Sequence, residues 1–505
     1  MLWTRASGVS SVRVCPPCPG PCNSVHNSAL LSLCGDAVVM QRVLARSVRL
    51  CCRRSCTARF SPAEPHAAPS KEDKERRLAA NQLRTAGSLL AALAPHVRSD
   101  AALAQRVKAL SGERQFNSSS RRLYRELLFA AVRHWGWVET LLSGPHGELG
   151  AAAAAAFLAD DTPEVRRLRD ANEASLVALG ARSSRELAAA RDALQLAYPA
   201  AALCTPEDLA APAWFRAQCS AAELPPAEVA LSRAPLYIRV QMPDAESELR
   251  AELAKLGVSV REVPQLLGAW ELRCGRTWTD VDLTATDGYQ AGVFEIQDLG
   301  SQTLLAVVTP EPGGKWLDAC AGAGGKSLQL AALLGPNGRV TACDVREEAL
   351  RELRRRARRA RLENRITTLQ CDWASNGSGA DGDLFDGVLV DAPCTGSGTW
   401  RRQPHLRWLL TPEAVAAAAQ RQLQILHAAA KRIRPGGLLV YATCSLADAE
   451  NGGVVDAFLR NAPFEAVPLP RASALGLSAP DGRLTISPAL LNSDGFFVAA
   501  MRRSA

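Results

Sequence analysis

Apolar and polar positions along the 505-residue chain follow three successive patterns. In the first, from about Leu78 to Phe215, apolar residues recur every three to four positions, as in NQLRTAGSLLAALAPHV and RRLYRELLFAAVRHWGWVETLL. This period puts the apolar side chains on one face of a helix, so the stretch predicts an all-helical domain. The run Ala151 to Ala156 is also expected to be helical, and no internal repeat is visible.

The second and third patterns lie beyond the proline-containing joint AELPPAEV. The segment APLYIRVQM alternates apolar and polar residues, and with the helical stretch AESELRAELAKLG it predicts a small α+β module up to about Thr286. From Phe294 onward apolar strands alternate with helices, which is typical of a parallel, doubly wound sheet. The predicted fold class is therefore α/β: a Rossmann-like domain over 301–505, preceded by an α+β module over 232–300 and a helical domain over 76–225.

Residues 1–75 are expected to be a leader. Met1 to Ser70 contain eight Arg, no Lys and two acids, a charge of +6 that leaves only +2 of the overall +8 for the rest of the chain. Composition rich in Arg, Ser and Ala and poor in acids is typical of an organelle transit peptide. A second methionine, Met40, opens an amphipathic, Arg-rich stretch and is an alternative start. We expect a mitochondrial address, with a plastid address or an unstructured basic tail as alternatives.

The cysteines and the apolar runs exclude other classes of protein. Seven of the fifteen Cys lie in the leader, and Cys15, Cys18 and Cys22 lack a fourth ligand for zinc, so no metal site is expected. The other eight show no framework spacing, which fits a reducing compartment. No run of roughly 18 apolar residues exists, so we expect no membrane span.

A glycine-rich turn follows the first strand of the α/β region, in GGKWLDACAGAGGKSLQLAALL. The strand Trp316 to Ala319 leads into Gly322, Gly324 and Gly325, and a helix is predicted to begin near Ser327. Glycines let the backbone approach a ligand, and a helix N-terminus offers free amides. Alone, this pattern fits any nucleotide-binding protein.

Two acids at later strand ends narrow the choice of ligand. Asp344 in RVTACDVREEAL lies 26 residues after Asp318, where an acid can bind both ribose hydroxyls. The GxGxxG spacing of dinucleotide-binding proteins is absent, which favours S-adenosylmethionine. Asp372 in TTLQCDWAS fits either a contact with the adenine amino group or a helix cap, and Cys371 is expected in the core.

Two thiols are predicted to reach the same edge of the sheet. The strand in FDGVLVDAPCTGSGTWRRQPHLRW delivers Asp391, Pro393 and Cys394 to the carboxyl edge, and the strand in LLVYATCSLADAEN delivers Cys444. Ligands of open α/β sheets bind at this edge. A buried Cys is usually a small hydrophobic residue, but two thiols beside a cofactor loop are hard to explain by packing.

The segments DACAGAGGK, DAPCTGSGTWRR and YATCSLADAEN, in this order, resemble the RsmB-like, or Nol/Nop/Sun, RNA cytosine-C5 methyltransferases. The resemblance covers about Ala234 to Arg502. It implies that Cys444 adds to carbon 6 of cytosine as the nucleophile, that Cys394 assists loss of the carbon 5 proton and enzyme release, and that Asp391 holds the base edge. DNA cytosine-C5 enzymes attack with the Cys of their Pro-Cys loop, and the Thr-Cys loop argues against them.

The same resemblance implies the residues that contact S-adenosylmethionine: Cys320, Ala321, Gly322, Ala323, Gly324, Gly325, Lys326, Asp344, Asp372 and Asp391. Lys326 is alternatively a solvated lysine at a helix start. In FEIQDLGSQ, Gln297 and Asp298 either help to fix the loops or cap a helix. The chain departs from the family pattern at Ala323, where Pro is usual, and at Gly452 and His405, where acids are common, and the last of these puts the RNA target in doubt.

RNA contacts are expected near the Pro-Cys loop. In TWRRQPHLRW, Trp400, Arg401, Arg402 and Arg407 offer stacking and charge for a flipped base. The basic run Arg351 to Arg365 is better explained as a docked helix with solvated arginines, because its Leu350, Leu353, Ala357 and Leu362 share one face. In family terms the α+β module resembles an RNA-recognition subdomain, and the helical domain occupies the place of a NusB-like RNA-binding bundle.

The sequence therefore predicts an organellar, S-adenosylmethionine-dependent RNA 5-methylcytosine methyltransferase. Ribosomal RNA is the expected substrate, within an assembling organellar ribosomal subunit, and the protein is expected to be a monomer without a membrane partner. Two alternatives stay open: a tRNA methyltransferase of the same chemistry, and an rRNA-binding ribosome-assembly factor for which methylation is dispensable.

Overall fold

The structure of the protein, a computed structural model, describes residues 70–99, 102–113, 115–172, 187–220, 224–274, 281–375, 382–479 and 481–505. Residues 1–69 of the predicted leader, with its cysteines and Met40, lie outside the described residues, so the transit peptide and the start site stay predictions. Residues 71–75, which were assigned to the leader, belong instead to the first helix of the helical region. Residues Pro69–Ala505 form one compact unit. Within the described residues, no helix is both long and apolar enough to cross a membrane.

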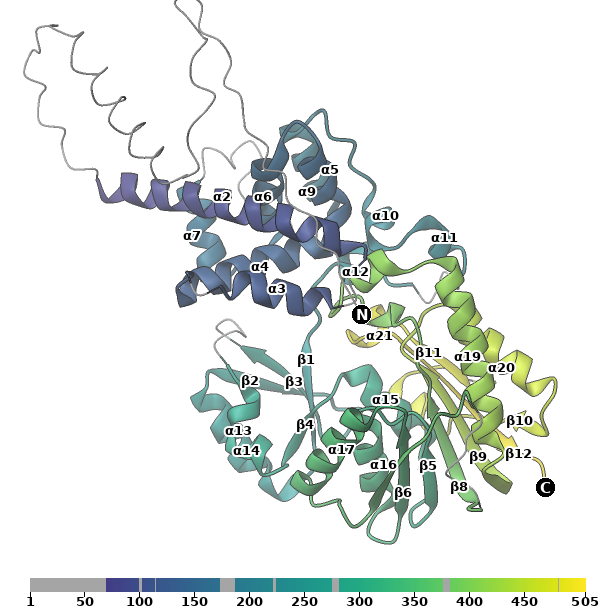
Figure 1. Cartoon of the computed structure of the whole chain (residues 1–505). Coiled ribbons are helices and arrows are strands. Elements are labelled where there is room, and N and C mark those ends of the chain that lie inside the picture. The colour runs from purple at the N-terminus through teal and green to yellow at the C-terminus, as the bar shows by residue number, and fades with distance from the viewer. Residues whose placement is uncertain are drawn as a thin grey trace, which may run out of the picture. The chain divides into compact units, whose positions relative to one another are not determined.

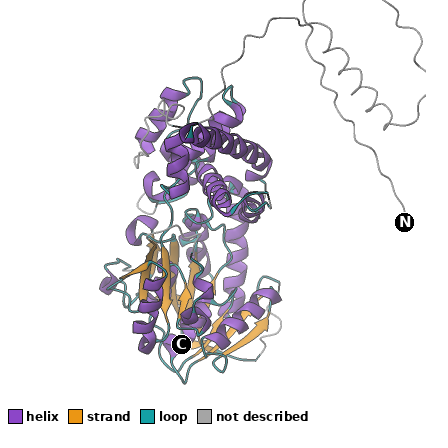
Figure 2. Ribbon diagram, turned by 90° about the vertical axis from the view of Figure 1, so that its left-hand side faces the viewer, coloured by secondary structure: helices purple, strands orange, loops and turns teal. Residues whose placement is uncertain are grey.

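The first part of this unit is helical (Figures 1 and 2). Polar caps begin several of its helices: Ser70 accepts a hydrogen bond from Asp73 N in a capping box, and Asn117 and Thr162 cap two later helices. The alanine run is helical as expected, in α6, and it is buried there. The described helices are α2 (Lys71–Val97), α3 (Leu103–Ser111), α4 (Ser118–Arg133), α5 (Trp135–Ser143), α6 (Gly147–Leu158), α7 (Pro163–Ala171), α9 (Leu187–Ala197), α10 (Pro206–Ala210), α11 (Ala213–Arg216) and α12 (Ala227–Ala230).

A small antiparallel sheet follows, in the strand order β2-β3-β1-β4. Its core contains Ile238, Trp270, Leu272 and Phe294, which pack with Leu249 and Leu253 of the covering helix α13. The elements are β1 (Leu236–Val240), α13 (Glu246–Lys255), β2 (Val258–Glu262), β3 (Ala269–Cys274), α14 (Asp287–Gln290) and β4 (Phe294–Ile296), with short 3-10 turns at Pro243–Ala245 and Leu283–Ala285. This is the predicted α+β module.

The remaining described strands form a larger sheet in the order β10-β12-β9-β8-β5-β6-β7, with β11 paired to β12. The pairs among β5 to β9 are parallel, and β12 joins β9 antiparallel. The strands are β5 (Lys315–Asp318), β6 (Arg339–Asp344), β7 (Ile366–Gln370), β8 (Phe385–Asp391), β9 (Ile433–Thr443), β10 (Phe464–Ala466), β11 (Arg483–Ile486) and β12 (Phe496–Arg503). The doubly wound sheet and the α/β fold class are confirmed.

Helices cover both faces of the large sheet because neighbouring strand residues alternate between two cores (Figure 1). Leu389 and Val440 pack toward α15, α16 and α17, whereas Val390 and Tyr441 pack toward α19 and α20. On α17 the predicted apolar face is buried at Leu350, Leu353 and Ala357. The helices are α15 (Leu299–Val308), α16 (Gly325–Leu334), α17 (Glu347–Arg359), α18 (Leu406–Leu409), α19 (Pro412–Ala430), α20 (Gly452–Leu459) and α21 (Pro488–Leu491), with 3-10 turns at Ser397–Thr399, Asp448–Glu450 and Ser473–Leu475.

The direction of chain progression reverses beside β5. From β5 the chain proceeds outward through β6 and β7, and then returns to the other side of β5 with β8 and β9. A reversal of this kind opens a crevice at the carboxyl ends of the two central strands, which is where open α/β sheets bind ligands. The loops after β5, β6, β8 and β9 all meet at this edge.

Candidate active site

Two thiols lie in contact at the carboxyl edge. Cys394 follows β8, Cys444 follows β9, and their Sγ atoms are 3.3 Å apart. The two strands pair in parallel with Asp391 opposite Ala442, and Gly398 N donates to Cys444 O at 2.9 Å. The prediction that one rim carries both cysteines is confirmed by this geometry, whereas their chemical roles stay predictions.

The Cys394 thiol keeps its proton more firmly than an ordinary cysteine. Its hydrogen bond with Cys444 and its burial raise the pKa of Cys394 well above the usual value, and the nearby Glu450 carboxylate acts in the same direction. Two thiolates at 3.3 Å would repel each other. A protonated Cys394 can donate a hydrogen bond to Cys444, which suits Cys444 as the nucleophile.

An ion pair borders the thiols. Lys326 Nζ lies 2.8 Å from Asp391 Oδ2, and the lysine side chain is only 11% exposed. Burial alone would lower the pKa of Lys326, but the adjacent Asp391 carboxylate more than offsets it, so the net shift is upward and the ammonium stays charged. Lys326 is thus not a solvated lysine at the start of a helix.

The glycine-rich turn after β5 has the backbone that its sequence predicts. Gly322 and Gly324 adopt φ of +54° and +89°, and α16 begins at Gly325, two residues before the predicted start. A Cβ on Gly324 would lie 2.5 Å from Cγ of Leu353, so a side chain is excluded there. Asp344, at the end of β6, accepts a hydrogen bond from Gly322 N at 2.8 Å and fixes the turn against the next strand.

Asp372 and its neighbour Cys371 both have contacts within the protein that need no ligand. Asp372 accepts hydrogen bonds from Ala374 N at 3.0 Å and Ser375 Oγ at 2.6 Å. These bonds resemble those of a helix cap, but the described residues that follow, 373–375, form a turn. Cys371 is buried in the core, as expected. An adenine contact for Asp372 stays a prediction.

A buried carboxyl group that sequence reasoning did not single out lies below the turn. Asp318, at the end of β5, is fully buried; its Oδ2 accepts a hydrogen bond from Ser327 Oγ at 2.6 Å, and its Oδ1 has no partner among the described residues. Burial raises the pKa of Asp318 to about 7. Its position directly before the glycine turn was the available signal.

The residues of this edge fit S-adenosylmethionine. The turn with positive φ leaves room for a ligand close to the backbone, and the carboxylates of Asp344 and Asp391 lie at two strand ends of the same edge. Acidic groups suit both the ribose hydroxyls and the cationic sulfonium of that molecule. The backbone N and the Nε of Arg346 both donate hydrogen bonds to the Asp344 carboxylate and hold it in place.

The four residues expected to contact RNA are structural in this molecule. Arg407 is 1% exposed and donates to the carbonyls of Arg133, Leu209 and Ala230, which belong to the helical region. Trp400 is buried between Phe215 and Arg407. These side chains join the Pro-Cys loop to the helices instead of forming an exposed surface.

The other two arginines are used in the same way. Arg401 donates to Ser232 Oγ and to Asn492 Oδ1, and Arg402 pairs with Asp298 and Asp494. Asp298 also caps α15 through Gly300 N, so both roles considered for it are present. Gln297 accepts from Arg239 Nε at 2.7 Å and donates to Gln329 at 2.9 Å. A contact of any of these four residues with RNA stays a prediction.

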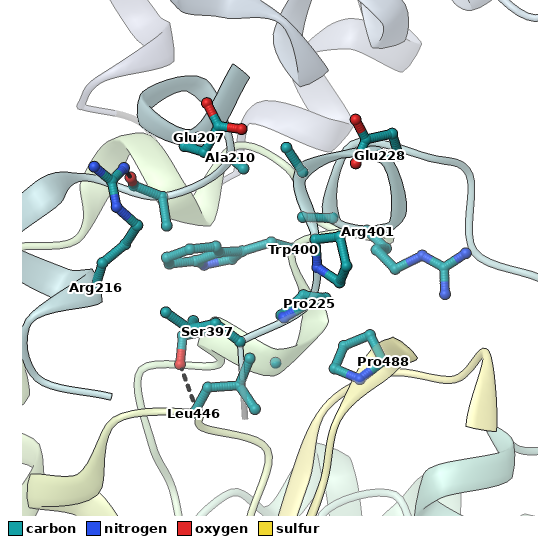
Figure 3. A pocket seen from close by; sticks show the side chains of 16 residues that line it. Glu207, Ala210, Arg216, Pro225, Glu228, Ser397, Trp400, Arg401, Leu446 and Pro488 are labelled. Atoms are coloured by element: carbon teal, nitrogen blue, oxygen red, sulfur yellow. Dashed lines mark hydrogen bonds between the residues drawn. The ribbon is translucent and has the colours of Figure 1, made fainter. Parts of the chain in front are cut away.

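A cavity of about 190 Å³ lies beside the thiol loops (Figure 3). Trp400 stands in it, with Ser397 and Leu446 on one side and the helical region on the other, and Ser397 Oγ accepts a hydrogen bond from Leu446 N at 2.8 Å. Neither thiol lines the cavity. It belongs to the junction of the catalytic loops with the helices.

Comparisons with known proteins agree with this geometry. A family model described as 16S rRNA methyltransferase RsmB/F matches residues 305–502. Ribosomal RNA small subunit methyltransferase B of Xanthomonas campestris is 32% identical over 320 residues, which cover 62% of this chain and 70% of that protein. The chain belongs to the RsmB/F methyltransferase family. The predicted family and the predicted cofactor, S-adenosylmethionine, are confirmed.

Other members and a solved structure extend the comparison. The probable ribosomal RNA small subunit methyltransferase B of Bacillus subtilis is 33% identical over 267 residues, covering 52% of this chain. The chain spans only 58% of the length of that relative. The crystal structure of PH0851 superposes with a TM-score of 0.59 at 21% identity, covering 86% of this chain and 100% of that one, which supports the fold.

Proposed function

We propose that this RsmB/F family member is an S-adenosylmethionine-dependent RNA methyltransferase that forms 5-methylcytosine through a covalent Cys444–cytosine intermediate. The observation that carries the proposal is the contact of Cys394 and Cys444 at 3.3 Å beside the Lys326–Asp391 pair and the glycine turn. Carbon 5 of cytosine is too poor a nucleophile to take a methyl group directly. A thiolate that adds to carbon 6 removes this obstacle.

Each residue of the site has its own role in the proposed methylation. Cys444 Sγ forms a bond to carbon 6, and the electron pair of the carbon 5–carbon 6 double bond becomes available at carbon 5. The bound cofactor supplies an electrophilic methyl group for that carbon. Cys394 assists removal of the carbon 5 proton, after which the carbon–sulfur bond breaks and the aromatic ring is restored. Asp391, held by Lys326, orients the edge of the base.

Ribosomal RNA of the small subunit is the proposed substrate, because the relatives from Xanthomonas campestris and Bacillus subtilis are named for it. The Arg-rich, acid-poor leader supports a mitochondrial address. Bisulfite sequencing of organellar RNA with and without the protein tests both points. We expect one or more cytosines in rRNA to resist conversion when the protein is present and to be converted when it is absent. If such a change occurs only in a tRNA, the substrate assignment is refuted.

Two cysteine variants test the chemistry. With S-adenosylmethionine and substrate RNA, Cys444→Ala should form no denaturant-resistant complex, because no carbon–sulfur bond can form. Cys394→Ala should accumulate such a complex, because release is impaired. Denaturing gels with labelled RNA measure both, and the opposite pattern would reverse the assignment of the two thiols.

A further inference from the structure

One buried carboxylate connects the two thiol loops. Glu450, in the turn Asp448–Glu450 before α20, has no exposed surface. It accepts hydrogen bonds from Thr395 N at 2.9 Å and from the Thr395 hydroxyl, directly after Cys394. It also accepts one from Ser445 Oγ at 2.6 Å, directly after Cys444.

A third element meets the same carboxylate. Gln422 of α19 donates to Glu450 Oε2 at 2.8 Å and to Pro393 O at 3.1 Å, and accepts from the Tyr441 hydroxyl at 3.1 Å. The single hydrogen of the Tyr441 hydroxyl is shared between Gln422 Oε1 and the nearer Glu450 O, at 2.6 Å. The loop after β8, the loop after β9 and helix α19 are therefore all attached to one side chain.

Stabilisation of the fold does not by itself explain a buried carboxylate at this position. The four groups that donate to the Glu450 carboxylate are the Thr395 amide and hydroxyl, the Ser445 hydroxyl and the Gln422 amide, and all of them are uncharged. A buried carboxylate loses several kcal/mol of hydration, and apolar residues of similar volume often stabilise a core better. What the carboxylate does offer is a fixed meeting point, since its two oxygens can accept four hydrogen bonds.

We propose that Glu450 is a positioning residue that sets the separation of the two active-site thiols by holding the residue after each cysteine to one carboxylate. Its importance for methylation rests on the proposed function, whereas its effect on the thiol separation does not. Glu450 touches neither the methyl donor nor the base in this scheme. It acts through the two loops.

The variants separate geometry from charge. In Glu450→Gln the amide oxygen can replace Oε2 and keep the bonds from Thr395 N and Gln422, while the amide nitrogen faces the two hydroxyls, which can rotate to accept from it. Glu450→Ala removes every contact. Ser445→Ala keeps Glu450 but removes the donor beside Cys444, together with the bonds of that hydroxyl to Ser397 Oγ and Ala447 N. It covers the case in which Glu450→Ala does not fold.

A control carboxylate lies on strand β8 at the opposite edge of the sheet. Asp386 accepts a hydrogen bond from Lys315 N and pairs with Arg434, far along the strand from the loop that carries Cys394. Asp386→Asn therefore perturbs the same strand through a half-buried carboxylate without touching the thiol loops.

The first measurement reports the thiol separation without RNA or cofactor. The full-length protein is treated with oxidised glutathione: one cysteine thiolate attacks its disulfide and releases one glutathione, and the second cysteine thiolate then displaces the other, leaving a Cys394–Cys444 disulfide and two reduced glutathiones. Mass spectrometry of non-reduced peptides follows the rate. Because an error of about 1 Å in reacting geometry can cost up to about a hundredfold, we expect Glu450→Ala to slow the second step by roughly tenfold or more.

The pattern across the variants decides the proposal. Ser445→Ala should also slow closure and Asp386→Asn should match the wild-type rate. Glu450→Gln should close at least as fast as the wild type, because loss of the carboxylate charge lowers the pKa of Cys394. The melting temperature of each variant is checked separately. Wild-type closure in both Ser445→Ala and the folded Glu450→Ala would overturn the proposal. Slow closure in Glu450→Gln to the extent seen in Glu450→Ala would overturn it too, since the charge and not the positions of the bonds would then matter.

A second measurement tests whether Glu450 affects the rate of the reaction with RNA. In a Cys394→Ala background, the rate at which the denaturant-resistant RNA complex forms should fall with Glu450→Ala and not with Glu450→Gln, while the RNA concentration for half-maximal rate stays unchanged. Absence of any complex in Cys394→Ala itself would refute the proposed function and leave the disulfide result standing. Equal rates with and without Glu450→Ala would refute the positioning role in catalysis.

Discussion

The buried Asp318 carboxyl group should give the protein a characteristic pH dependence of stability. Its Oδ1 has no partner among the described residues, and burial raises its pKa from 3.8 to about 7 in the folded protein. Between these two values the folded state holds a proton that the unfolded state has lost. Raising the pH through this window therefore lowers the free energy of unfolding, and above about pH 7 the loss is complete.

The magnitude follows from the shift. Each pKa unit corresponds to 1.36 kcal/mol, so moving from 3.8 to about 7 implies a full cost of roughly 4 kcal/mol, of which about 3 kcal/mol develops above pH 5. Asp318→Asn removes this term. Its amide oxygen can keep the hydrogen bond from Ser327, while its amide nitrogen remains unpaired at a pH-independent cost of about 1–3 kcal/mol.

The assay is urea unfolding of both proteins at several pH values from 5 to 8, without cofactor. Other groups titrate alike in the two proteins, so the difference in unfolding free energy isolates Asp318. The stability of Asp318→Asn relative to wild type should rise by about 3 kcal/mol from pH 5 to pH 8. A difference that stays flat across this range would refute the assignment of a protonated, desolvated Asp318.

Three further outcomes are expected from local changes. Gly324→Ala should abolish S-adenosylmethionine binding in calorimetry, because φ is +89° and the new Cβ meets Leu353, whereas Gly335→Ala, with φ of +71° and open space around it, should keep binding at some cost in stability. Arg407→Met should lower the unfolding free energy by about 3 kcal/mol and increase hydrogen exchange in α18, since three carbonyls lose a charged donor. Glu295→Gln should lower the melting temperature while Cys444 still forms its RNA adduct, because this carboxylate is buried between two arginines of α17.

Much of the catalytic domain was predictable because its signals are local. A strand that ends in Asp391-Ala392-Pro393-Cys394 must place its next residues at the carboxyl edge, and parallel pairing then brings Cys444 to the same rim. The apolar face of α17 followed from its spacing in the same way. Such features depend on the spacing of apolar residues and on the direction of a strand, and both can be recognised in short stretches of sequence.

The contacts of the loop after Cys394 were not predictable in this way. Arg407 and Trp400 look like an exposed, RNA-facing pair in sequence, yet their partners are carbonyls and rings of residues about 170 to 280 positions earlier. The sequence places Glu450 in the segment behind the Cys444 loop, but its contacts were not predictable for a similar reason, since Gln422 and Thr395 approach it only once the sheet and α19 have packed. Spacing within a segment carries no information on partners supplied by another segment.

Strand β12 makes the timing of biosynthesis relevant to this site. Phe496–Arg503 pairs with β9 over six residues, and Gly495 N, just before it, donates to Gly398 O in the loop that follows Cys394. Until these residues leave the ribosome, β9 is an unpaired edge and one side of the Cys394 loop has no support. A nascent chain, or one cut short by a late stop codon, should therefore contain both thiols and every cofactor-turn residue and still be inactive.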